Sequence, residues 1–295
     1  MNTLFRRLSG PSAPAVGLFF VSGLVLAPSI SAAELKVVSW NLRHEGWSGE
    51  KYYDADAEQI WMEFGTSATS PAGCDLVFLQ EVMSTDAAAG ITTALESYTG
   101  YDWSYAASPL VGRTTYKEMY AVVYRTDRVS IVSQALWTDT GDKFEREPYI
   151  VKVREKSVNA DFTFIDWHTV FGTTTDRKNE ITAMASVFST VQSRDTADQD
   201  VILLGDHNMS ATSTIWGEAF ASVSPRVSYA VNDLTSLNSS GSYANAYDHF
   251  WFQTQYLTEY YASGRDYVPD TLWHVENLSD HAPIFLHLKF TTDGD

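Results

Sequence analysis

Ser279-Asp280-His281-Ala282-Pro283, followed at once by Ile284–Phe290, is the most informative stretch of this chain. Apolar residues at every second position of Ile284–Phe290 predict a β-strand with one buried face. The strand fixes a carboxylate and an imidazole, adjacent in sequence, at the edge of a sheet. Metal-dependent hydrolases need both groups, because a carboxylate binds hard cations and an imidazole carries a proton near neutral pH. Since many surface turns contain Ser, Asp and His, the tripeptide gains meaning only if other parts of the chain supply partners.

The first 33 residues have the pattern of a secretory signal peptide. Two arginines precede the apolar run Val16–Ala27, and Ser31-Ala32-Ala33 provides small residues for cleavage. The run is short and interrupted for a membrane span. We therefore expect a signal peptide at 1–33, one domain at 34–295, and a protein exported to the periplasm or the extracellular space without stable membrane association.

Composition limits the classes of partner. The formal net charge is −17, and removal of the two arginines of the signal peptide makes it −19 (−17 − 2). This charge argues against a protein that coats DNA through a broad basic face, but not against an enzyme that meets phosphate through a cation and a few arginines. Cys74 is the only cysteine, so no intrachain disulfide can form, and we expect it to be a buried small hydrophobe. No linker or repeat divides the chain, and we expect a monomer.

Segments typical of strands alternate with segments typical of helices. Eight strands are predicted, at Leu35–Trp40, Leu76–Leu79, Met119–Tyr124, Tyr149–Val153, Phe162–Trp167, Val201–Leu204, Phe250–Phe252 and Ile284–Phe290. Helical spacing is found over Tyr53–Phe64, Ala87–Tyr98 and Asp176–Val191. This order predicts an α/β fold in which two sheets pack together with helices outside.

Polar residues gather where the predicted strands end. They are Asn41, Glu81, His168, Asp206, Asn208, Asp248, Asp280 and His281. Each is ordinary alone, since Asp and Asn are frequent in turns and a single His is more often a packed core residue. Strand ends converge in layered folds, so the set can form one pocket. A set rich in oxygen and without cysteine suits Mg²⁺, Mn²⁺ or Ca²⁺ better than a structural zinc.

Six motifs in this order resemble the deoxyribonuclease I branch of the endonuclease/exonuclease/phosphatase superfamily, over nearly the whole of Leu35–Phe290. They are Ser39-Trp40-Asn41, Gln80-Glu81, Trp167-His168, Gly205-Asp206-x-Asn208, Tyr247-Asp248 and Ser279-Asp280-His281. The segments Gly112–Glu118 and Arg146-Glu147-Pro148 are closer to deoxyribonuclease I itself. The resemblance implies a four-layer α/β (α+β) sandwich, two packed mixed β-sheets flanked by helices, and phosphoester hydrolysis.

The resemblance also implies a metal site. Glu81 would be the main ligand of Mg²⁺ or Mn²⁺, with Asn41 and Asp280 close by as ligands or outer partners. A turn at Asp139 and Asp142 replaces the disulfide-bearing loop of the mammalian enzymes, and it is a candidate for a structural Ca²⁺ site, although acidic turns are usually only solvated.

Catalytic roles follow from the same resemblance. His168 would be oriented by Glu118, and His281 by Asp248, with each carboxylate raising the pKa of its imidazole. Asp206 and Asn208 would align the attacking water and a phosphate oxygen. Which histidine is the acid and which the base stays open at this point. We expect structural or surface roles for the other histidines, which are His44, His207, His249, His274 and His287.

Four residues are candidates for contact with the substrate. Arg43, Arg113 and Tyr116 stand where the resembling nucleases approach the minor groove and its phosphates, and Arg146 is a weaker candidate. After Glu81 the chain has Val82-Met83, where the mammalian enzymes carry an arginine that reaches the minor groove, so the preference for double-stranded DNA can differ.

We expect a secreted endonuclease that depends on a divalent metal and hydrolyses DNA to products with 5′-phosphate ends. One alternative is a phospholipid phosphodiesterase of sphingomyelinase type on the same fold, for which the aromatic segment Tyr256–Tyr267 offers a candidate membrane contact. The other is a non-catalytic, toxin-like binding module. Its weakness is that such a module has no physical reason to keep both histidine–carboxylate sets.

Overall fold

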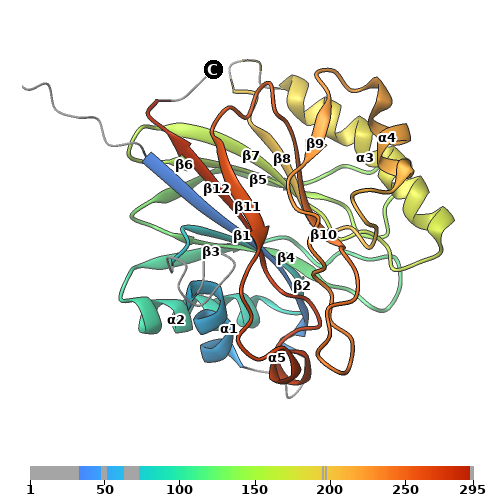
Figure 1. Cartoon of the computed structure of the whole chain (residues 1–295). Coiled ribbons are helices and arrows are strands. Elements are labelled where there is room, and N and C mark those ends of the chain that lie inside the picture. Colours follow the sequence, from blue (N-terminus) through green and yellow to red (C-terminus); the bar gives the residue numbers. More distant parts are fainter. Residues whose placement is uncertain (1–32, 48–51, 63–72, 195, 197, 293–295) are drawn as a thin grey trace, which may run out of the picture. The chain divides into compact units, whose positions relative to one another are not determined.

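The computed structural model describes residues 33–47, 52–62, 73–194, 196 and 198–292. Residues 1–32 of the predicted signal peptide lie outside this part. The compact unit Ala32–Asp295 contains two six-stranded sheets, shown in Figure 1. None of its described helices is long and apolar enough to cross a membrane.

The first sheet combines the beginning and the end of the chain, in the order β11-β12-β1-β2-β4-β3. Its strands are β1 (Ala33–Glu45), β2 (Leu76–Val82), β3 (Trp103–Ala107), β4 (Met119–Arg125), β11 (Tyr260–Arg265) and β12 (Ile284–Phe290). β1 runs parallel to β2 and antiparallel to β12. The sheet is therefore mixed, and it brings the Ser279-Asp280-His281 turn beside the end of β1.

The second sheet is built from the middle of the chain, in the order β5-β6-β7-β8-β10-β9. Its strands are β5 (Val129–Leu136), β6 (Tyr149–Glu155), β7 (Ala160–Asp166), β8 (Val201–Asp206), β9 (Val227–Tyr229) and β10 (Asp248–Gln253). Only β7 and β8 pair in parallel among these strands. Asp206 and Asp248 face each other in the β8–β10 register.

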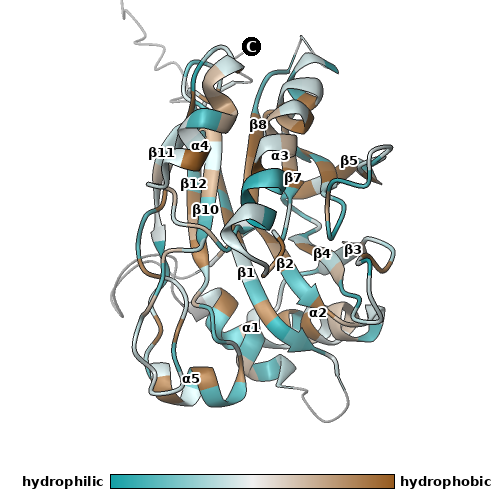
Figure 2. Ribbon diagram, turned by 90° about the vertical axis from the view of Figure 1, so that its right-hand side faces the viewer, coloured by the Kyte–Doolittle hydropathy of each residue, from teal (hydrophilic) through white to brown (hydrophobic). Residues whose placement is uncertain are grey.

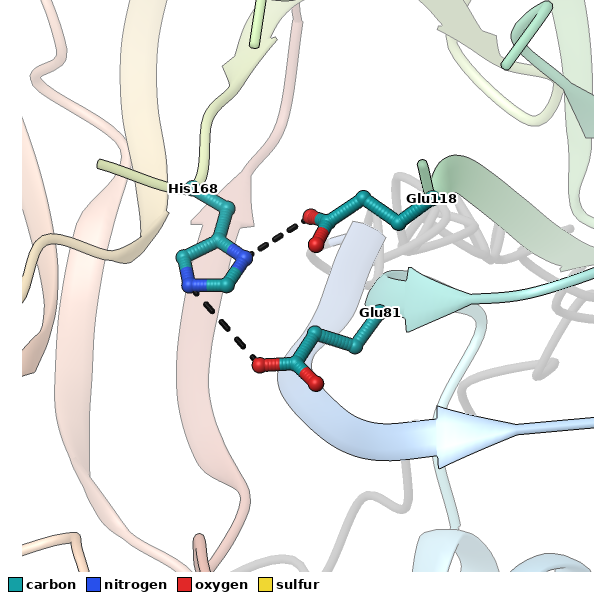
Figure 3. A group of neighbouring side chains, drawn as sticks. All are labelled: Glu81, Glu118 and His168. Carbon is teal, nitrogen blue, oxygen red and sulfur yellow. Dashed lines mark hydrogen bonds and ion pairs between the residues drawn. The ribbon is translucent and has the colours of Figure 1, made fainter. Parts of the chain in front are cut away.

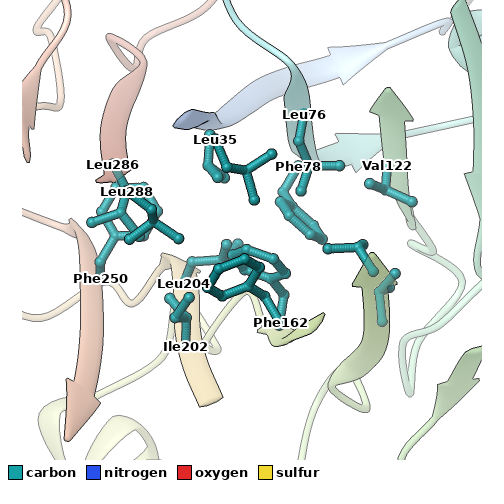
Figure 4. Packing of buried hydrophobic residues seen from close by; sticks show 14 of the residues in the cluster. Leu35, Leu76, Phe78, Val122, Phe162, Ile202, Leu204, Phe250, Leu286 and Leu288 are labelled. Atoms are coloured by element: carbon teal, nitrogen blue, oxygen red, sulfur yellow. The ribbon is translucent and has the colours of Figure 1, made fainter. Parts of the chain in front are cut away.

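The two sheets enclose the main hydrophobic core. Strand side chains alternate in direction, so Leu35 and Val37 point into this core while Val38 and Trp40 point to the outer face of the first sheet. Figure 4 shows residues from both sheets meeting in the core, including Phe78 and Phe162. Burial of such large apolar side chains contributes roughly 1.5–3 kcal/mol each and holds the layers together.

Helices cover the outer face of each sheet. α1 (Tyr53–Met62) and α2 (Thr85–Thr99) pack on the first sheet, while α3 (Thr174–Arg194) and α4 (Thr214–Ala219) pack on the second. A short 3₁₀ turn, Phe220–Ser222, follows α4, and α5 (Thr271–Asn277) leads into the Ser279-Asp280-His281 turn. Figure 2 shows hydrophobic residues along the strands, with hydrophilic residues frequent in the surrounding loops. The prediction of a four-layer sandwich is confirmed.

The sequence predicted the interior strands of both sheets but not their edge strands. All eight predicted strands exist, and β12 has the predicted bounds. The strands that the sequence pattern missed are β3, β5, β9 and β11, which are the edge strands of the two sheets. β11 lies within the aromatic segment that was considered for membrane contact, so a large part of that segment is sheet rather than a free loop. The predicted end of α1 at Phe64 falls outside the described residues.

Candidate active site

The first histidine–carboxylate pair joins the two sheets. His168 lies two residues after β7 of the second sheet, and Glu118 immediately precedes β4 of the first. Nδ1 of His168 is 2.7 Å from Oε1 of Glu118, and both residues are buried. Figure 3 shows the opposite ring nitrogen, Nε2, directed toward Glu81, at 3.8 Å from its Oε1. The carboxylate therefore fixes the ring so that Nε2 remains for chemistry.

The second pair repeats this arrangement with the sheets exchanged. His281 precedes β12 of the first sheet, and Asp248 begins β10 of the second. Nδ1 of His281 is 2.7 Å from Oδ2 of Asp248. The hydroxyl of Thr235 donates a hydrogen bond of 2.5 Å to the same carboxylate oxygen. Each imidazole is thus oriented by a carboxylate that comes from the other sheet.

Asp206 lies between the two imidazoles. Its Oδ2 is 3.6 Å from Nε2 of His168 and 3.5 Å from Nε2 of His281. The amide of Asn41 donates to Oδ2 of Asp206 at 3.1 Å and to Oε1 of Glu81 at 3.0 Å. One amide therefore bridges the carboxylates of Asp206 and Glu81 across the two sheets.

Asn208 joins the same group through its side chain and its backbone. Its amide nitrogen is 3.4 Å from Nε2 of His168 and donates to the carbonyl of Thr169 at 3.0 Å. Its backbone N–H donates to Oδ1 of Asp206 at 2.8 Å. These contacts fix Asn208 beside the reactive nitrogen of His168.

Unusual backbone conformations place several of these groups. Glu81 (φ 56°) and Asn208 (φ 48°) adopt left-handed conformations that cost free energy in residues with a Cβ. The pairing of β2 with β4 shifts register between Leu79 and Val82, which frees Glu81 from the regular ladder. At Gly205 (φ 127°) a Cβ would lie 2.2 Å from the carbonyl oxygen of Trp167, so only glycine fits before Asp206.

The Ser279-Asp280-His281 turn is fastened to the end of β1. The hydroxyl of Ser279 donates to the carbonyl of Asn41 at 2.6 Å and accepts from the backbone N–H of His281 at 3.0 Å. The indole of Trp40 donates to the carbonyl of His281 at 2.7 Å. The serine of the turn therefore has a structural role, which is to hold the imidazole in register with Asn41.

The charges around the two imidazoles raise both pKa values. Burial alone would lower the pKa of His281, but the carboxylates of Asp248 and Asp206 outweigh it and raise the pKa well above its ordinary value. For His168, burial and the Arg146 guanidinium lower the pKa, but the negative charge and hydrogen bond of Glu118 outweigh them. The net shift of the His168 pKa is therefore upward. Burial, reinforced by Asp248, raises the pKa of Asp206 against the opposing effect of His281 and His168.

The residues around Glu81 suit a hard divalent cation. The amide-bridged carboxylates of Glu81 and Asp206 supply oxygen donors in one place, and ligand atoms of Glu81, Glu118 and His168 lie within 4.8 Å of one another. The structure places Asn41 against Glu81 as predicted. Asp280 lines the same cleft, but no described hydrogen bond or ion pair joins its side chain to Glu81. Among the described contacts, Asn41 links Glu81 to Asp206, whereas none links Glu81 to the predicted partner Asp280.

A cleft of about 530 Å³ opens over these groups. Three of the four predicted substrate contacts, Arg43, Tyr116 and Arg146, line it. The guanidinium of Arg43 donates to the carbonyl of Val275 at 2.7 Å, and the hydroxyl of Tyr116 donates to Oε2 of Glu81 at 3.3 Å. Burial and the charge of Glu81 raise the pKa of Tyr116, so it remains a neutral phenol that donates to this carboxylate.

Arg146 and Arg113 lie differently from expectation. Arg146 lines the cleft but is buried, with ion-pair contact to Glu118 at 3.4 Å and hydrogen bonds to the carbonyls of His168 and Thr169. Because its donors bind protein groups, it supports the His168–Glu118 pair. Arg113 is paired with Asp142 at 2.9 Å and is absent from the described lining of the cleft.

The acidic turn considered for Ca²⁺ is occupied by the protein itself. Oδ2 of Asp139 accepts the backbone N–H groups of Lys143 and, at 2.9 Å, Phe144, and Oδ1 accepts that of Gly141. Asp142 is paired with Arg113. These contacts give both acids a structural role in the turn and leave the Ca²⁺ hypothesis without support from this loop.

Sequence reasoning missed two residues of the site. His44, which we expected to be structural, lines the cleft with its Nε2 3.1 Å from Oε2 of Glu81. Its position three residues after Asn41 gave no signal, because a regular strand would have continued there, whereas His44 has a left-handed backbone (φ 67°). Thr235, which binds Asp248, lies in a loop with no distinguishing pattern.

His207 is packed, as its sequence position suggested. It is fully buried, and its ring lies against Trp167, Trp216 and His249. Burial, with His249 as a further cause, lowers its pKa well below the ordinary value. His207 therefore stays neutral between the two site residues Asp206 and Asn208.

Comparisons with known proteins agree with this geometry. No family model matches the chain. The deoxyribonuclease of Thioalkalivibrio sp. (strain K90mix) is 30% identical over 295 residues, covering 95% of this chain and 78% of that protein. Deoxyribonuclease-1-like 1 of Chlorocebus aethiops is 30% identical over 234 residues, covering 75% of this chain and 76% of the relative.

Solved structures agree at the level of the fold. An endonuclease/exonuclease/phosphatase family protein from Bacteroides thetaiotaomicron superposes with a TM-score of 0.62, covering 88% of this chain and 96% of that one. The identity over this match is 17%, so it bears on the fold alone.

Proposed function

Because this chain belongs to the deoxyribonuclease I-like branch of the endonuclease/exonuclease/phosphatase superfamily, we propose that it is an exported endonuclease that depends on a divalent metal and cleaves DNA. Membership makes it a hydrolase of the nuclease and phosphodiesterase class. DNA as the substrate and products with 5′-phosphate ends are the more specific parts of the proposal, and the names of the relatives support the first of them.

One observation carries the proposal. Two imidazoles, each held through Nδ1 by a buried carboxylate, direct Nε2 toward the same Asp206 in a single cleft. Hydrolysis of a phosphodiester needs one group that takes a proton from water and another that gives a proton to the leaving oxygen. Two separately tuned imidazoles provide both within one site.

The charges around the two imidazoles assign one proton transfer to each histidine. His281 has the more strongly raised pKa and faces no opposing cation among its main influences, so it suits the protonated role. His168 is opposed by Arg146 and loses its proton more easily, so it suits the base. Water then forms a bond to phosphorus while the bond to the 3′-oxygen breaks. His168 receives the proton of the water, and His281 gives a proton to the leaving oxygen.

Other residues orient the substrate and the water. Asn208 presents its amide beside Nε2 of His168, where it can bind a phosphate oxygen. Glu81 and Asp206, bridged by Asn41, would hold Mg²⁺ or Mn²⁺. When bound, the cation neutralises negative charge that develops on the phosphate oxygens. The protein contributes the fixed donors and the burial that strengthen every such interaction.

Plasmid relaxation tests the proposal directly. Purified mature protein is incubated with supercoiled plasmid in Mg²⁺ or Mn²⁺, and in EDTA. We expect nicking with either metal and none in EDTA, with ligatable 5′-phosphate ends in the products. Intact plasmid under all conditions would remove DNA from the proposal.

The phospholipid alternative is tested in parallel with sphingomyelin liposomes. Tyr261 of the aromatic segment is exposed, but it lies on the edge strand β11 and its ring contacts His287. This placement gives the segment a role in the sheet and disfavours a membrane hairpin. Lipid turnover with intact plasmid would favour the sphingomyelinase-type function over the nuclease.

Export and oligomeric state complete the proposal. The charge and apolar pattern of residues 1–33 support removal of a signal peptide, and expression in a secreting bacterium followed by N-terminal sequencing tests it. A mature chain that begins at or near Glu34 is expected. Light scattering of the same preparation is expected to give the mass of a monomer without bound lipid.

A further inference from the structure

Three aromatic rings form a cluster beside Glu81. His44 stacks on Trp47 with ring centroids 4.6 Å apart, and the ring of Tyr116 packs in T-shaped geometry against both, with centroids 5.4 Å from His44 and 5.8 Å from Trp47. His44 and Tyr116 also bind Oε2 of Glu81. Trp47 is 49% exposed, so an aromatic surface in contact with two other rings lies beside the proposed metal ligand.

Phe171 lines the cleft on the side of the second sheet, whereas Trp47 is outside the described lining and contacts His44 and Tyr116, which belong to it. Phe171 follows β7 three residues after His168, and its side chain is 80% exposed. A phenylalanine this exposed contributes little to the stability of the fold, because an aromatic ring stabilises a protein when it is buried. Its exposure at the cleft therefore points to a bound molecule with flat apolar surfaces.

Cations around the cleft are already engaged by the protein. Arg43 binds the carbonyl of Val275, Arg146 binds Glu118, and Arg113 is paired with Asp142. The chain as a whole carries a net charge of −17. Affinity for duplex DNA depends chiefly on neutralising phosphates with Lys and Arg, whereas unpaired bases bind by stacking on aromatic rings.

We propose that Trp47 and Phe171 stack on unpaired bases of the substrate, so that single-stranded or locally unpaired DNA is cleaved in preference to duplex. The inference rests on the proposed nuclease function and specifies its substrate. Trp47, supported by His44 and Tyr116, holds a base on the Glu81 side of the cleft, and Phe171 holds one on the His168 side. Paired bases in a duplex have no free face to offer to either ring.

Matched variants test the proposal. A labelled single-stranded oligonucleotide and the duplex of the same sequence are cleaved in Mg²⁺ by the wild type, Trp47→Ala and Phe171→Ala. Trp273→Ala is the control, because Trp273 is 44% exposed on α5 and, unlike Trp47, has no described ring contact with a residue that lines the cleft. Binding of oligothymidylate in EDTA, followed by quenching of tryptophan fluorescence, measures stacking without turnover.

We expect the wild type to cleave the single strand about tenfold faster than the duplex. Loss of one stacking ring should lower affinity for the single strand about tenfold, leave duplex cleavage within about twofold, and remove quenching in Trp47→Ala. Trp273→Ala should behave as the wild type.

The contrary outcomes are distinct. Equal or faster cleavage of duplex, or equal loss on both substrates in Trp47→Ala, would overturn the stacking proposal while leaving the nuclease intact. Turnover of sphingomyelin vesicles that needs Trp47 and Phe171, without cleavage of either DNA, would overturn both and make the rings a membrane contact. No cleavage of DNA or lipid would remove the nuclease function and its substrate together.

Discussion

The two histidine–carboxylate pairs have the same geometry but different surroundings. In both, Nδ1 lies 2.7 Å from a carboxylate oxygen, and Nε2 lies about equally far from Asp206. Glu118, however, is shared between His168 and the cation Arg146, whereas Asp248 is shared between His281 and the neutral hydroxyl of Thr235.

This difference shows how one fold can prepare two imidazoles for opposite tasks. A buried cation beside Glu118 partly cancels its effect on His168, while the full charge of Asp248 acts on His281. Identical pair distances therefore do not imply identical chemistry. The partner of the carboxylate sets the proton affinity of the ring.

Removal of either imidazole should have the largest effect. We expect His168→Ala and His281→Ala each to lower kcat on plasmid DNA by roughly 10²–10⁴-fold, the range of general acid–base catalysis. If the tasks differ, excess imidazole in the buffer should rescue the two variants with different pH optima, because one needs the neutral form and the other the cation. Identical rescue profiles would contradict the division of roles.

Asp248→Asn should destabilise the protein by about 3 kcal/mol at pH 6, because it leaves the buried His281 without its charged partner. The folded pKa of His281 is raised, so the pair stabilises fully below the unfolded value of about 6.5. This contribution is lost as the pH rises through the folded pKa. Urea unfolding of metal-free protein in EDTA should show the deficit shrinking at alkaline pH, and a constant deficit would disprove the linkage.

Gly205→Ala should disturb the first pair more than the second. The added Cβ meets the carbonyl of Trp167, next to His168, and the backbone conformation already disfavours a side chain. We expect a loss of roughly 2 kcal/mol in the free energy of unfolding and slower turnover. Gly217→Ala is the control, because its Cβ would meet nothing within 4 Å. Equal stability of the two variants would show that Gly205 is replaceable.

Arg146→Gln should make the first pair resemble the second. Without the cation, the pKa of His168 should rise toward that of His281, since Arg146 now lowers it. Proton NMR titration of the metal-free protein measures both imidazoles, and His281 serves as the internal reference. A fall in the pKa of His168 would mean that Arg146 acts by ordering Glu118 rather than by its charge.

Local sequence pattern predicted the interior of both sheets because interior strands are buried on two faces. β12, for example, is an alternating run in which nearly every residue is buried. The edge strands escaped because one side of each lacks a neighbour. β5 has several exposed residues in its middle, and β9 has only three residues. Hydrophobic periodicity is weak in such strands, so pairing with the rest of the sheet determines them.

The candidate site divides along a similar line. The polar residues at strand ends could be recognised from their positions beside predicted strands, and the resemblance to the superfamily assigned their pairing, including that of Glu118 with His168. The role of Arg146 depends on burial against Glu118, and the place of His44 depends on a register shift in β1, neither of which leaves a local pattern. Both are set by tertiary contacts between segments far apart in sequence.

Each catalytic pair takes one member from each sheet, and Asn41 joins Glu81 of the first sheet to Asp206 of the second. The geometry of the site therefore depends on how accurately the two sheets are aligned. A slide of one sheet over the other by an ångström would part both imidazoles from their carboxylates while every strand remained intact. Activity should consequently be lost at a lower denaturant concentration than the circular dichroism signal of the β-sheets. Enzymatic activity is then the more sensitive measure of the packing between the two sheets.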